Sequence, residues 1–312
     1  MIFNNGFLLS IIIPVLNEQN NIKPLLQRLL PIIKNYKYEV IFIDDGSTDK
    51  TNSEIKKYTS KNSNIKLISF YRNFGHQMAL SCGYSKASGD CIISMDSDLQ
   101  DPPEIIQQMI NKWKSGSLVV YAKRKTRNVD NLFKRISASF FYNLMNFLSD
   151  VPIPKDVGDF RLLDRKIVDY LNSLPEQSKF LRGLVAWGGF TASFVSFDRG
   201  KRNSGETHYS FGKMVNFALD GIISFSVKPL RLATFFGFLA AFIGFLGMLY
   251  AIIGKFYFPE DLVSGWAAIF VGLMFLGGVQ LITIGIIGEY IGKIFTQIQN
   301  RPNYTIKERL NI

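Results

Sequence analysis

Two long apolar segments constrain the fold of this chain more than any other feature. Residues 230–253 carry a single charged side chain, Arg231 near the start, and residues 267–287 carry none. Each segment exceeds the about 20 residues that an α-helix needs to cross the hydrocarbon core of a bilayer. The connection over residues 254–265 is too short to form a domain. The sequence therefore predicts a hairpin of two transmembrane helices.

Basic residues flank this hairpin and are scarce in its loop. The loop holds only Lys255, which two acidic residues offset, whereas the flanks carry Lys228, Arg231, Lys293, Arg301, Lys307 and Arg309. The positive-inside rule then places both termini in the cytoplasm. The N-terminus lacks a basic segment followed by a long apolar one, so no signal peptide is expected. No ionisable residue lies mid-span, which argues against a transport pathway, and glycines in both segments predict close helix packing.

The charge balance suits a membrane surface or a phosphate-bearing ligand. Lysine and arginine number 36 against 25 acidic residues, a net charge of +11, and 47% of the residues are hydrophobic. Nucleic acid is not expected as a partner, because the chain has no zinc-ligand spacing, RNP-like motif or basic zipper. Cys82 and Cys91 lie in apolar or small surroundings and are interpreted as buried free thiols. Two histidines are too few for a His-rich metal centre.

The first part of the chain alternates between strand and helix patterns. Five apolar runs of strand length alternate with helical stretches, at residues 8–14, 38–43, 65–70, 91–95 and 118–122. This alternation predicts a largely parallel, doubly wound α/β sheet. Polar or charged residues follow each run, and the carboxyl ends of such strands are where open α/β sheets bind ligands. A dinucleotide-binding glycine fingerprint and a Walker A loop are both absent from the sequence.

The run ending in Asp96-Ser97-Asp98 is the strongest single candidate for a metal site. If the backbone is extended there, Asp96 and Asp98 point the same way, and two carboxylates suit Mg²⁺ or Mn²⁺ bound to a diphosphate. Asp101, followed by Pro102 and Glu104, predicts a helix N-cap with a capping box. Further along, residues 131–148 and 211–227 predict helices that lie in a membrane interface, with ordinary core helices as the alternative.

The chain resembles the family-2 glycosyltransferases that load a sugar onto a polyprenyl phosphate. The pattern is most similar to bactoprenol (undecaprenyl) phosphate glucosyltransferases and more distantly to dolichol-phosphate mannose synthases. The matching segments are Ser10-Ile11-Ile12-Ile13-Pro14-Val15-Leu16-Asn17-Glu18, Asp44-Asp45-Gly46-Ser47, Arg72-Asn73-Phe74-Gly75, Asp96-Ser97-Asp98-Leu99-Gln100-Asp101-Pro102, Gly158-Asp159-Phe160-Arg161-Leu162, Gly277-Gly278-Val279-Gln280 and Gly288-Glu289-Tyr290-Ile291-Gly292.

The resemblance implies a Rossmann-like GT-A fold and an inverting single displacement. It implies a nucleoside-diphosphate sugar, UDP-glucose first and UDP-N-acetylglucosamine next, with undecaprenyl phosphate as acceptor and Mg²⁺ or Mn²⁺ as cofactor. It further implies a homo-oligomer, a tetramer, in the bacterial cytoplasmic membrane. The expected division is a nucleotide-sugar-binding core over 1–125, an acceptor-side region over 126–229, the hairpin over 230–292 and a cytoplasmic tail over 293–312.

The resemblance also assigns roles to matching residues. Asp96 and Asp98 would hold the metal and the diphosphate. Asp159 would be the catalytic carboxylate, and Asp98 would also take part in catalysis. The acceptor phosphate would meet Arg124 and Arg135, with Lys134 either joining them or remaining a solvated interface charge. The nucleotide sugar would be bound by Pro14, Asn17, Glu18, Asp45, Arg72 and Arg202. Many relatives have lysine where this chain has His208, so His208 is a doubtful diphosphate ligand.

The chemistry leaves the role of Asp159 open. A phosphate monoester has a second pKa near ~6, so the acceptor is mostly ionised at neutral pH and needs no strong base. Asp159 could position the acceptor, complete the metal site, or simply be a loop carboxylate paired with Arg161. Alternatives for the whole chain are a non-enzymatic translocator or scaffold, and transfer to a growing polysaccharide. One hairpin is too small to enclose a polymer channel.

Overall fold

The computed structural model describes residues 6–125, 154, 157–177, 179–198, 223, 226–257 and 265–312. The chain divides into two compact units. The first comprises residues 1–139, 151–211 and 300–312, and the second comprises residues 140–150 and 212–299. The predicted interface helices over 131–148 and most of 211–227 lie outside the described residues.

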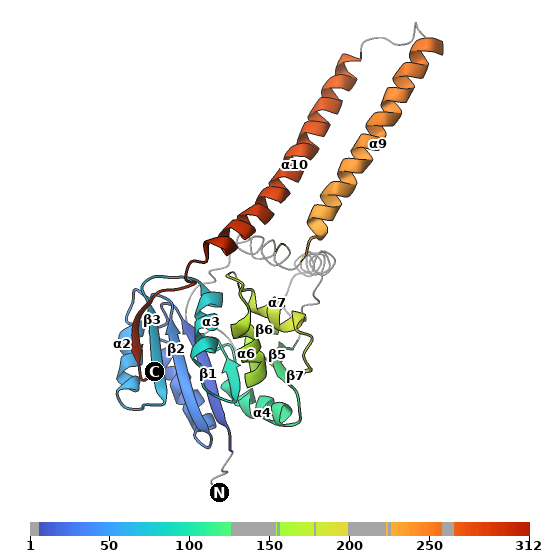
Figure 1. Ribbon diagram of the computed structural model, residues 1–312. Helices are drawn as coiled ribbons and strands as arrows, with labels where there is room; N and C mark the ends of the chain where they lie inside the picture. The colour runs from blue at the N-terminus through green and yellow to red at the C-terminus, as the bar shows by residue number, and fades with distance from the viewer. Residues whose placement is uncertain are drawn as a thin grey trace. The chain divides into compact units, whose positions relative to one another are not determined.

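The first unit is built on a mixed, mostly parallel sheet (Figure 1). Within the described ranges it has eight strands in the order β7-β5-β6-β4-β1-β2-β3-β8. The bounds are β1 Leu8–Val15, β2 Lys37–Asp44, β3 Ile65–Phe70, β4 Cys91–Ser94, β5 Val119–Arg124, β6 Val157–Asp164, β7 Ala192–Phe197 and β8 Ile306–Leu310. Strands β1 to β4 pair in parallel, as do β5 and β7, whereas β6 and β8 run antiparallel to their neighbours. The predicted α/β sheet is thus confirmed.

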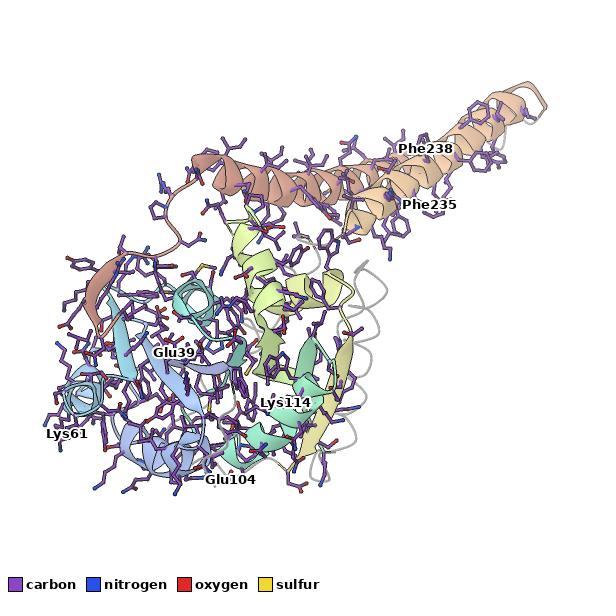
Figure 2. All side chains as sticks on the ribbon, turned by 60° about the horizontal axis from the view of Figure 1, so that its bottom comes forward. Glu39, Lys61, Glu104, Lys114, Phe235 and Phe238 are labelled. Carbon is purple, nitrogen blue, oxygen red and sulfur yellow. The ribbon has the colours of Figure 1, made fainter. Side chains whose placement is uncertain are left out.

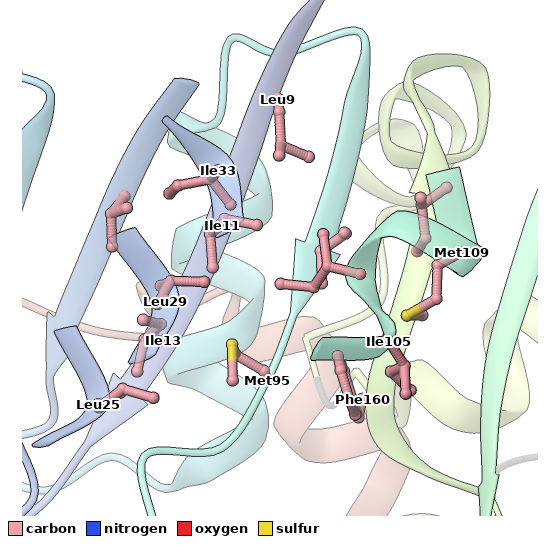
Figure 3. Packing of buried hydrophobic residues seen from close by; sticks show 14 of the residues in the cluster. Leu9, Ile11, Ile13, Leu25, Leu29, Ile33, Met95, Ile105, Met109 and Phe160 are labelled. Carbon is pink, nitrogen blue, oxygen red and sulfur yellow. The ribbon is translucent and has the colours of Figure 1, made fainter. Parts of the chain in front are cut away.

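Helices connect the strands of this unit. They are α1 Ile22–Ile33, α2 Thr51–Thr59, α3 His76–Lys86, a short 3-10 helix Pro103–Ile105, α4 Ile106–Lys114, α6 Arg165–Ser173 and α7 Leu181–Trp187. The period-2 face of β1 meets the 3.6-period face of α1, and Figure 3 shows Ile11 and Ile13 beside Leu25 and Leu29, with Leu9 farther along β1. All five side chains are fully buried, each stabilising the fold by about 1.5–3 kcal/mol.

Two local expectations at the fourth strand are wrong. Strand β4 ends at Ser94, so Asp96 and Asp98 lie in the following loop and strand alternation does not orient them. The predicted N-cap at Asp101 is not formed, because the 3-10 helix begins at Pro103 without a side-chain cap. The Asp101 carboxylate instead accepts a hydrogen bond from the backbone N–H of Asp96 at 3.3 Å. A hydrogen bond within the same loop, between residues five positions apart, has replaced the capping box.

The second unit contains two long apolar helices that contact each other, α9 Lys228–Tyr257 and α10 Trp266–Gln299. Lys228–Gly247 and Gly272–Gln299 are long and apolar enough to cross a membrane. Large apolar side chains project from both helices, and Figure 2 labels Phe235 and Phe238 on α9. Exposed apolar surface of this extent indicates a membrane or partner interface.

The glycines of these helices do not bring α9 and α10 close together. Across the described parts of both helices, a Cβ added at any glycine would meet no atom within 4 Å. In the described ranges the glycines therefore do not mediate the contact between α9 and α10, and the expectation that they allow close helix packing stays a prediction. Nearer the base of the hairpin, the Tyr290 hydroxyl donates to the carbonyl of Ser226 at 2.6 Å.

After α10 the chain returns to the first unit and supplies β8. This strand pairs with β3, and the side-chain amide of Asn311 donates to the carbonyls of Thr59 and Ile65 at 2.9 and 2.8 Å. Tyr304 stacks on Phe70 with ring centroids 4.9 Å apart. The residues that follow the hairpin therefore complete the edge of the sheet.

Both cysteines are free and buried, as predicted. Burial raises the pKa of Cys82 to about 11 and raises that of Cys91 as well. Since the thiolate is the reactive form, both side chains act as small apolar groups at neutral pH.

Candidate active site

The loops after β1 and β2 are tied together by Asn17. Its Oδ1 accepts hydrogen bonds from the backbone N–H and the hydroxyl of Thr48, at 2.8 and 3.3 Å. Its own backbone N–H donates to Ser47 Oγ at 2.9 Å, and its φ is +57°, a conformation that asparagine tolerates better than most residues. The neighbouring Glu18 donates its backbone N–H to Thr51 Oγ1 at 2.8 Å. Asn17 and Glu18, which were predicted to bind the nucleotide sugar, therefore hold together the loops that follow β1 and β2.

Asp45 joins the loop after β2 to the loop after β3. Its buried carboxylate accepts from the backbone N–H groups of Phe74 and Gly75, at 2.7 and 2.9 Å. Burial raises the pKa of Asp45 on balance, although these two hydrogen bonds oppose the rise. A Cβ on Gly46 would lie 2.5 Å from the carbonyl carbon of Arg72, so the close approach of the two loops requires glycine.

Arg72 and Pro14 complete this side of the site. The Arg72 guanidinium lies 4.1 Å from the centroid of the Phe74 ring, and one terminal nitrogen donates to the Asn73 carbonyl at 3.2 Å. Pro14 lies in β1, paired in register with Ile43 of β2. The carboxyl ends of β1, β2 and β3 thus form one connected set of loops.

An acidic loop follows β4, the next strand in the sheet. Asp98 Oδ1 accepts from the backbone N–H of Gln100 at 3.1 Å, and Leu99 between them has φ +64°. A left-handed leucine is a strained conformation that structures retain mainly at functional sites. Burial, together with the charges of Asp159 and Asp98, raises the pKa of Asp96. Burial and the Asp96 charge likewise raise the pKa of Asp101 to about 7.

These carboxylates fit a divalent cation. Burial raises the pKa values of Asp96 and Asp101, the charge of Asp98 adds to both, and a cation would relieve the repulsion among the three carboxylates. Among the residues that the structure describes, no group of three or more His, Cys, Asp or Glu side chains forms a protein-only metal cage. Mg²⁺ is commonly bound by one or two carboxylates with substrate phosphates completing the shell. Asp96 and Asp98 suit such a site.

Asp159 lies opposite this loop, in β6, and is the most strongly paired carboxylate of the site. Its two oxygens accept from Arg182, Nε at 3.0 Å and a terminal nitrogen at 2.7 Å. Arg161 approaches to 3.5 Å and the His76 Nε2 to 3.3 Å. Burial opposes ionisation, but Arg182 and His76 hold the pKa of Asp159 well below its usual range. The predicted pairing with Arg161 is present, though in a strand rather than a loop.

His76 connects the two acidic groups. Its Nε2 lies 3.7 Å from Asp96 Oδ1 as well as 3.3 Å from Asp159 Oδ2. Burial lowers the pKa of His76, but its hydrogen bond to Asp159 and the Asp96 charge outweigh this and raise it. His76 is the first residue of α3, directly after the predicted Arg72–Gly75 segment. When protonated, an imidazole between two carboxylates lowers the repulsion between them.

A buried polar network supports Asp159 from beneath. The wholly buried Arg161 donates through Nε to the Tyr84 hydroxyl at 3.3 Å, and this hydroxyl donates to Ser94 Oγ at 2.9 Å. Ser94 Oγ donates in turn to the Asp159 backbone carbonyl at 2.5 Å. This chain fixes the backbone of Asp159 against the end of β4.

Arg124 lies on the far side of Asp159 from the nucleotide loops. It is the last residue of β5, and a terminal nitrogen lies 3.4 Å from the position that a Cβ on Gly158 would occupy. Its charge also acts on Asp101. Four further residues named from the sequence, Arg135, Lys134, Arg202 and His208, lie outside the described ranges.

Sequence reasoning missed His76 and Arg182. A signal existed for His76, because it immediately follows the Arg72–Gly75 segment at a strand end. Arg182 gave no local signal, since its role depends on Asp159, a residue 23 positions earlier in the chain. Ionic partners at that separation become visible only when the sheet is assembled.

Comparisons with known proteins agree with this arrangement. Glycosyl transferase family 2 matches residues 10–171. A glycosyltransferase of Synechocystis sp. is 41% identical over 302 residues, covering 96% of this chain and 95% of the relative. Bactoprenol glucosyl transferases of Shigella phages SfII and SfV are also 41% identical, each covering 96% of this chain and 97% or 98% of the relative.

A solved structure supports the fold. Glucosyl-3-phosphoglycerate synthase from Mycobacterium tuberculosis, in complex with Mn²⁺, UDP-glucose and phosphoglyceric acid, superposes with a TM-score of 0.51. It is 18% identical and covers 70% of this chain and 78% of its own, so the likeness concerns the GT-A-like fold alone. The family match across half of the chain and the relatives that span nearly all of it show that this protein is a glycosyltransferase of family 2.

Proposed function

We propose that this protein transfers glucose from UDP-glucose to undecaprenyl phosphate, with inversion, on the cytoplasmic face of a bacterial membrane. The observation that carries the proposal is the pairing of two charge clusters at one sheet edge. Asp96 and Asp98 are neighbouring carboxylates that act on each other electrostatically, while Arg182 and Arg161 lie 2.7 and 3.5 Å from Asp159. The bactoprenol glucosyl transferases that match along the full chain support a polyprenyl phosphate as acceptor.

The donor would lie across the loops that follow β1, β2 and β3. Asn17 and Asp45 use their side chains to hold these loops, so their contribution is the shape of the nucleotide site. Pro14 and Glu18 would line it, and Arg72 would place a cation beside the uridine or the diphosphate. Arg202 would approach the diphosphate from the segment after β7. UDP-N-acetylglucosamine is the alternative donor.

Asp98, with Asp96, would hold Mg²⁺ or Mn²⁺ against the diphosphate. A divalent cation there neutralises charge that develops on the departing UDP. His76 would keep Asp96 oriented until the donor binds, because it lies 3.7 Å from that carboxylate. Asp98 is fixed by its hydrogen bond from the Gln100 backbone.

The acceptor phosphate would attack the anomeric carbon directly. With a second pKa near ~6 it is mostly a dianion at neutral pH, so it needs positioning more than deprotonation. Arg124, Arg135 and Lys134 would supply cations for it. Asp159 keeps its charge to well below neutral pH, which suits an electrostatic anchor better than a general base.

The membrane part of the proposal rests on α9 and α10 as a spanning hairpin, in a homo-oligomer that the family resemblance implies to be a tetramer. Lysine and arginine concentrate outside the hairpin loop, and the loop side would therefore face away from the cytoplasm. The pairing of β8 with β3 supports both helix ends lying on the same side of the bilayer as the catalytic unit.

The test is a transfer assay with the purified full-length protein in lipid nanodiscs. UDP-glucose and UDP-N-acetylglucosamine are each supplied with undecaprenyl phosphate, with and without Mg²⁺ or Mn²⁺. We expect UDP release that requires both the lipid phosphate and the metal, and a β-linked glucosyl phosphate as product. Binding of the lipid without transfer from any nucleotide sugar would contradict the proposal and indicate a scaffold.

A further inference from the structure

Three aromatic residues, Tyr304, Phe70 and Phe74, form a bridge from the C-terminal segment to the loop that follows β3. Tyr304, which precedes β8 in the chain, stacks on Phe70 with ring centroids 4.9 Å apart and planes inclined by 12°. Phe70 meets Phe74 edge to face, with centroids 5.8 Å apart. The guanidinium carbon of Arg72 lies 4.1 Å from the Phe74 centroid. This aromatic bridge therefore connects Tyr304 to a cation of the proposed donor site.

Phe74 is fixed through its backbone and through its ring. Its backbone N–H donates to Asp45 Oδ1 at 2.7 Å, and its ring contacts Phe70, the last residue of β3, which is 2% exposed. Arg72 is exposed and lies over the face of the Phe74 ring, whose π-electrons attract a cation. An exposed arginine otherwise samples many rotamers, and ligand binding must then offset the loss of that freedom. A fixed ring therefore preorganises the guanidinium.

Tyr304 is itself held on two sides. Its hydroxyl lies within hydrogen-bond distance of Ser85 Oγ in α3, at 3.3 Å. The carbonyl of the next residue, Thr305, accepts from the backbone N–H of Tyr71 at 3.2 Å. Burial raises the pKa of Tyr304 to about 12, so the hydroxyl stays protonated at neutral pH and can donate or accept a hydrogen bond. The ring therefore has a defined position against the end of β3.

The pairing of β3 with β8 becomes irregular at Phe70. Ser69 pairs with Glu308. Regular antiparallel pairing would then put Lys307 opposite Phe70, but Phe70 pairs with Ile306. Such irregularities redirect side chains and are frequent next to active sites. The path of the C-terminal segment therefore changes at the strand end that carries the aromatic bridge.

Other contacts attach β8 to the sheet, where it lies beside β3 (Figure 1). Glu308 forms an ion pair with Lys56 of α2 at 2.7 Å. The side chain of Asn311 donates to the carbonyls of Thr59 and Ile65. Closing the sheet edge accounts for these contacts, but it does not account for a ring that is linked to the donor-site loop.

We propose that Tyr304 is a positioning residue of the donor site. Through Phe70 and Phe74 it holds the Arg72 guanidinium in the orientation that a nucleoside diphosphate requires. This inference rests on the proposed function, because Arg72 is a donor-site cation there. It gives the C-terminal segment a part in donor binding, in addition to closing the sheet edge.

Removal of the Tyr304 ring is the first test. Binding of UDP to the full-length protein in nanodiscs is measured by calorimetry, with Mn²⁺ present and without the lipid acceptor. Tyr304→Leu should raise the Kd for UDP about three- to tenfold, because Arg72 would no longer be preorganised. Tyr304→Phe retains the ring and should stay within twofold of wild type. In the transfer assay, KM for undecaprenyl phosphate should stay within twofold for both variants.

A double-mutant cycle tests whether Tyr304 acts through Arg72. Arg72→Ala removes the cation and should weaken UDP binding by itself. In that background Tyr304→Leu should change the Kd for UDP by less than twofold, because the two residues act on the ligand as one unit. A general loosening of the site would instead give the same loss of affinity in both backgrounds.

Asn311→Gly is the matched control for damage to the edge strand. It removes both side-chain hydrogen bonds of Asn311, and glycine accepts the φ of +62° found there. We expect a lower melting temperature with a Kd for UDP within twofold of wild type. Tyr304→Leu should also lower the melting temperature, so the Kd for UDP separates the two variants.

Each outcome decides the inference. An unchanged Kd for UDP in folded Tyr304→Leu protein would overturn it, as would an equal loss in Asn311→Gly or a loss that persists in the Arg72→Ala background. If Tyr304→Leu does not fold, Phe74→Leu breaks the same bridge from the loop side, and an unchanged Kd there would overturn the inference. If the cycle behaves as expected but no sugar is transferred to the lipid phosphate, the proposed function fails while the positioning role stands.

Discussion

The two halves of the candidate site use polar residues in opposite ways. On the side of β1 to β3, Asn17 and Asp45 bond to backbone N–H groups of neighbouring loops. On the side of β4 and β6, Asp96 and Asp159 face charged side chains across the strand ends. The two groups differ in their partners. Residues that bond to backbone N–H groups hold the loops in place, whereas residues that face charged side chains can bind a charged ligand. Residues that are equally conspicuous in the sequence motifs therefore have different physical roles in the structure.

The largest expected effect breaks the acidic half. Asp98→Asn replaces a charged metal ligand by a neutral amide and should lower kcat by about 10²–10³, in line with losing one group that stabilises transition-state charge. The melting temperature should stay close to wild type, since Asp98 is partly exposed and its carboxylate accepts a hydrogen bond from the Gln100 backbone within the same loop. The measurement is kcat across an Mn²⁺ titration. Full activity of the wild type in EDTA would refute the metal site.

A matched change on the side of β1 to β3 should give the opposite result, with a large loss of stability and a smaller effect on the donor site. Asp45→Ala leaves two backbone N–H groups without their acceptor, at a cost of about 1–3 kcal/mol each, so the free energy of unfolding should fall by about 3 kcal/mol. Urea denaturation measures this loss, and donor affinity should fall only as the loops loosen. A variant with wild-type stability and no donor binding would instead make Asp45 a direct nucleotide ligand.

Arg124 tests whether the β5 side belongs to the acceptor. Arg124→Ala removes a charge-assisted contact worth on the order of 1.5–3 kcal/mol, so KM for the lipid phosphate should rise roughly ten- to a hundredfold. Arg124→Lys should recover part of the loss, because lysine retains charge but not the bidentate geometry. A lipid titration is paired with a UDP-binding isotherm. Collapse of donor affinity alone would move Arg124 to the diphosphate.

The smallest expected effect concerns pH and the metal-free protein. Asp101 has a pKa of about 7 in the folded state, above its unfolded value of about 3.9. Its protonated form therefore favours the folded state, and this stability is present below pH ~4 and lost as pH rises through about 7. In EDTA, Asp101→Asn should reduce the fall in unfolding free energy between pH 5 and pH 8 by about 2 kcal/mol. Parallel stability profiles for both proteins would contradict this assignment.

The sequence predicted the parts of the fold that local pattern controls. Strands β1 to β5 were found because each is a short apolar run followed by polar residues. Strand β8 was missed because Ile306–Leu310 alternates like an exposed edge, and its partner β3 lies far away in the chain. The capping box at Asp101 failed for a local reason, since its carboxylate accepts a hydrogen bond from the backbone N–H of Asp96, five residues earlier in the same loop. Long-range strand pairing decided β8, and a hydrogen bond within one loop decided Asp101.

The same rule applies to the site. Asp96, Asp98 and Asp159 stood out within motifs. His76 and Arg182 are recognised only by their contacts with Asp159, which the folded sheet brings next to them. The family resemblance named residues by position and did not distinguish the loop-building role of Asn17 from a ligand contact. The number and destination of hydrogen bonds provided that distinction.

Because β8 is near the end of the chain, the sheet can be completed only late in the synthesis of this protein. Ribosomes produce β3 long before β8, with α9 and α10 in between. Until then β3 presents an open edge, which can pair with other strands or be recognised by chaperones. The last strand can close this edge only after both apolar helices have left the ribosome. Nascent chains stalled within the hairpin would therefore carry an unfinished sheet, which couples quality control of the catalytic unit to completion of the membrane segment.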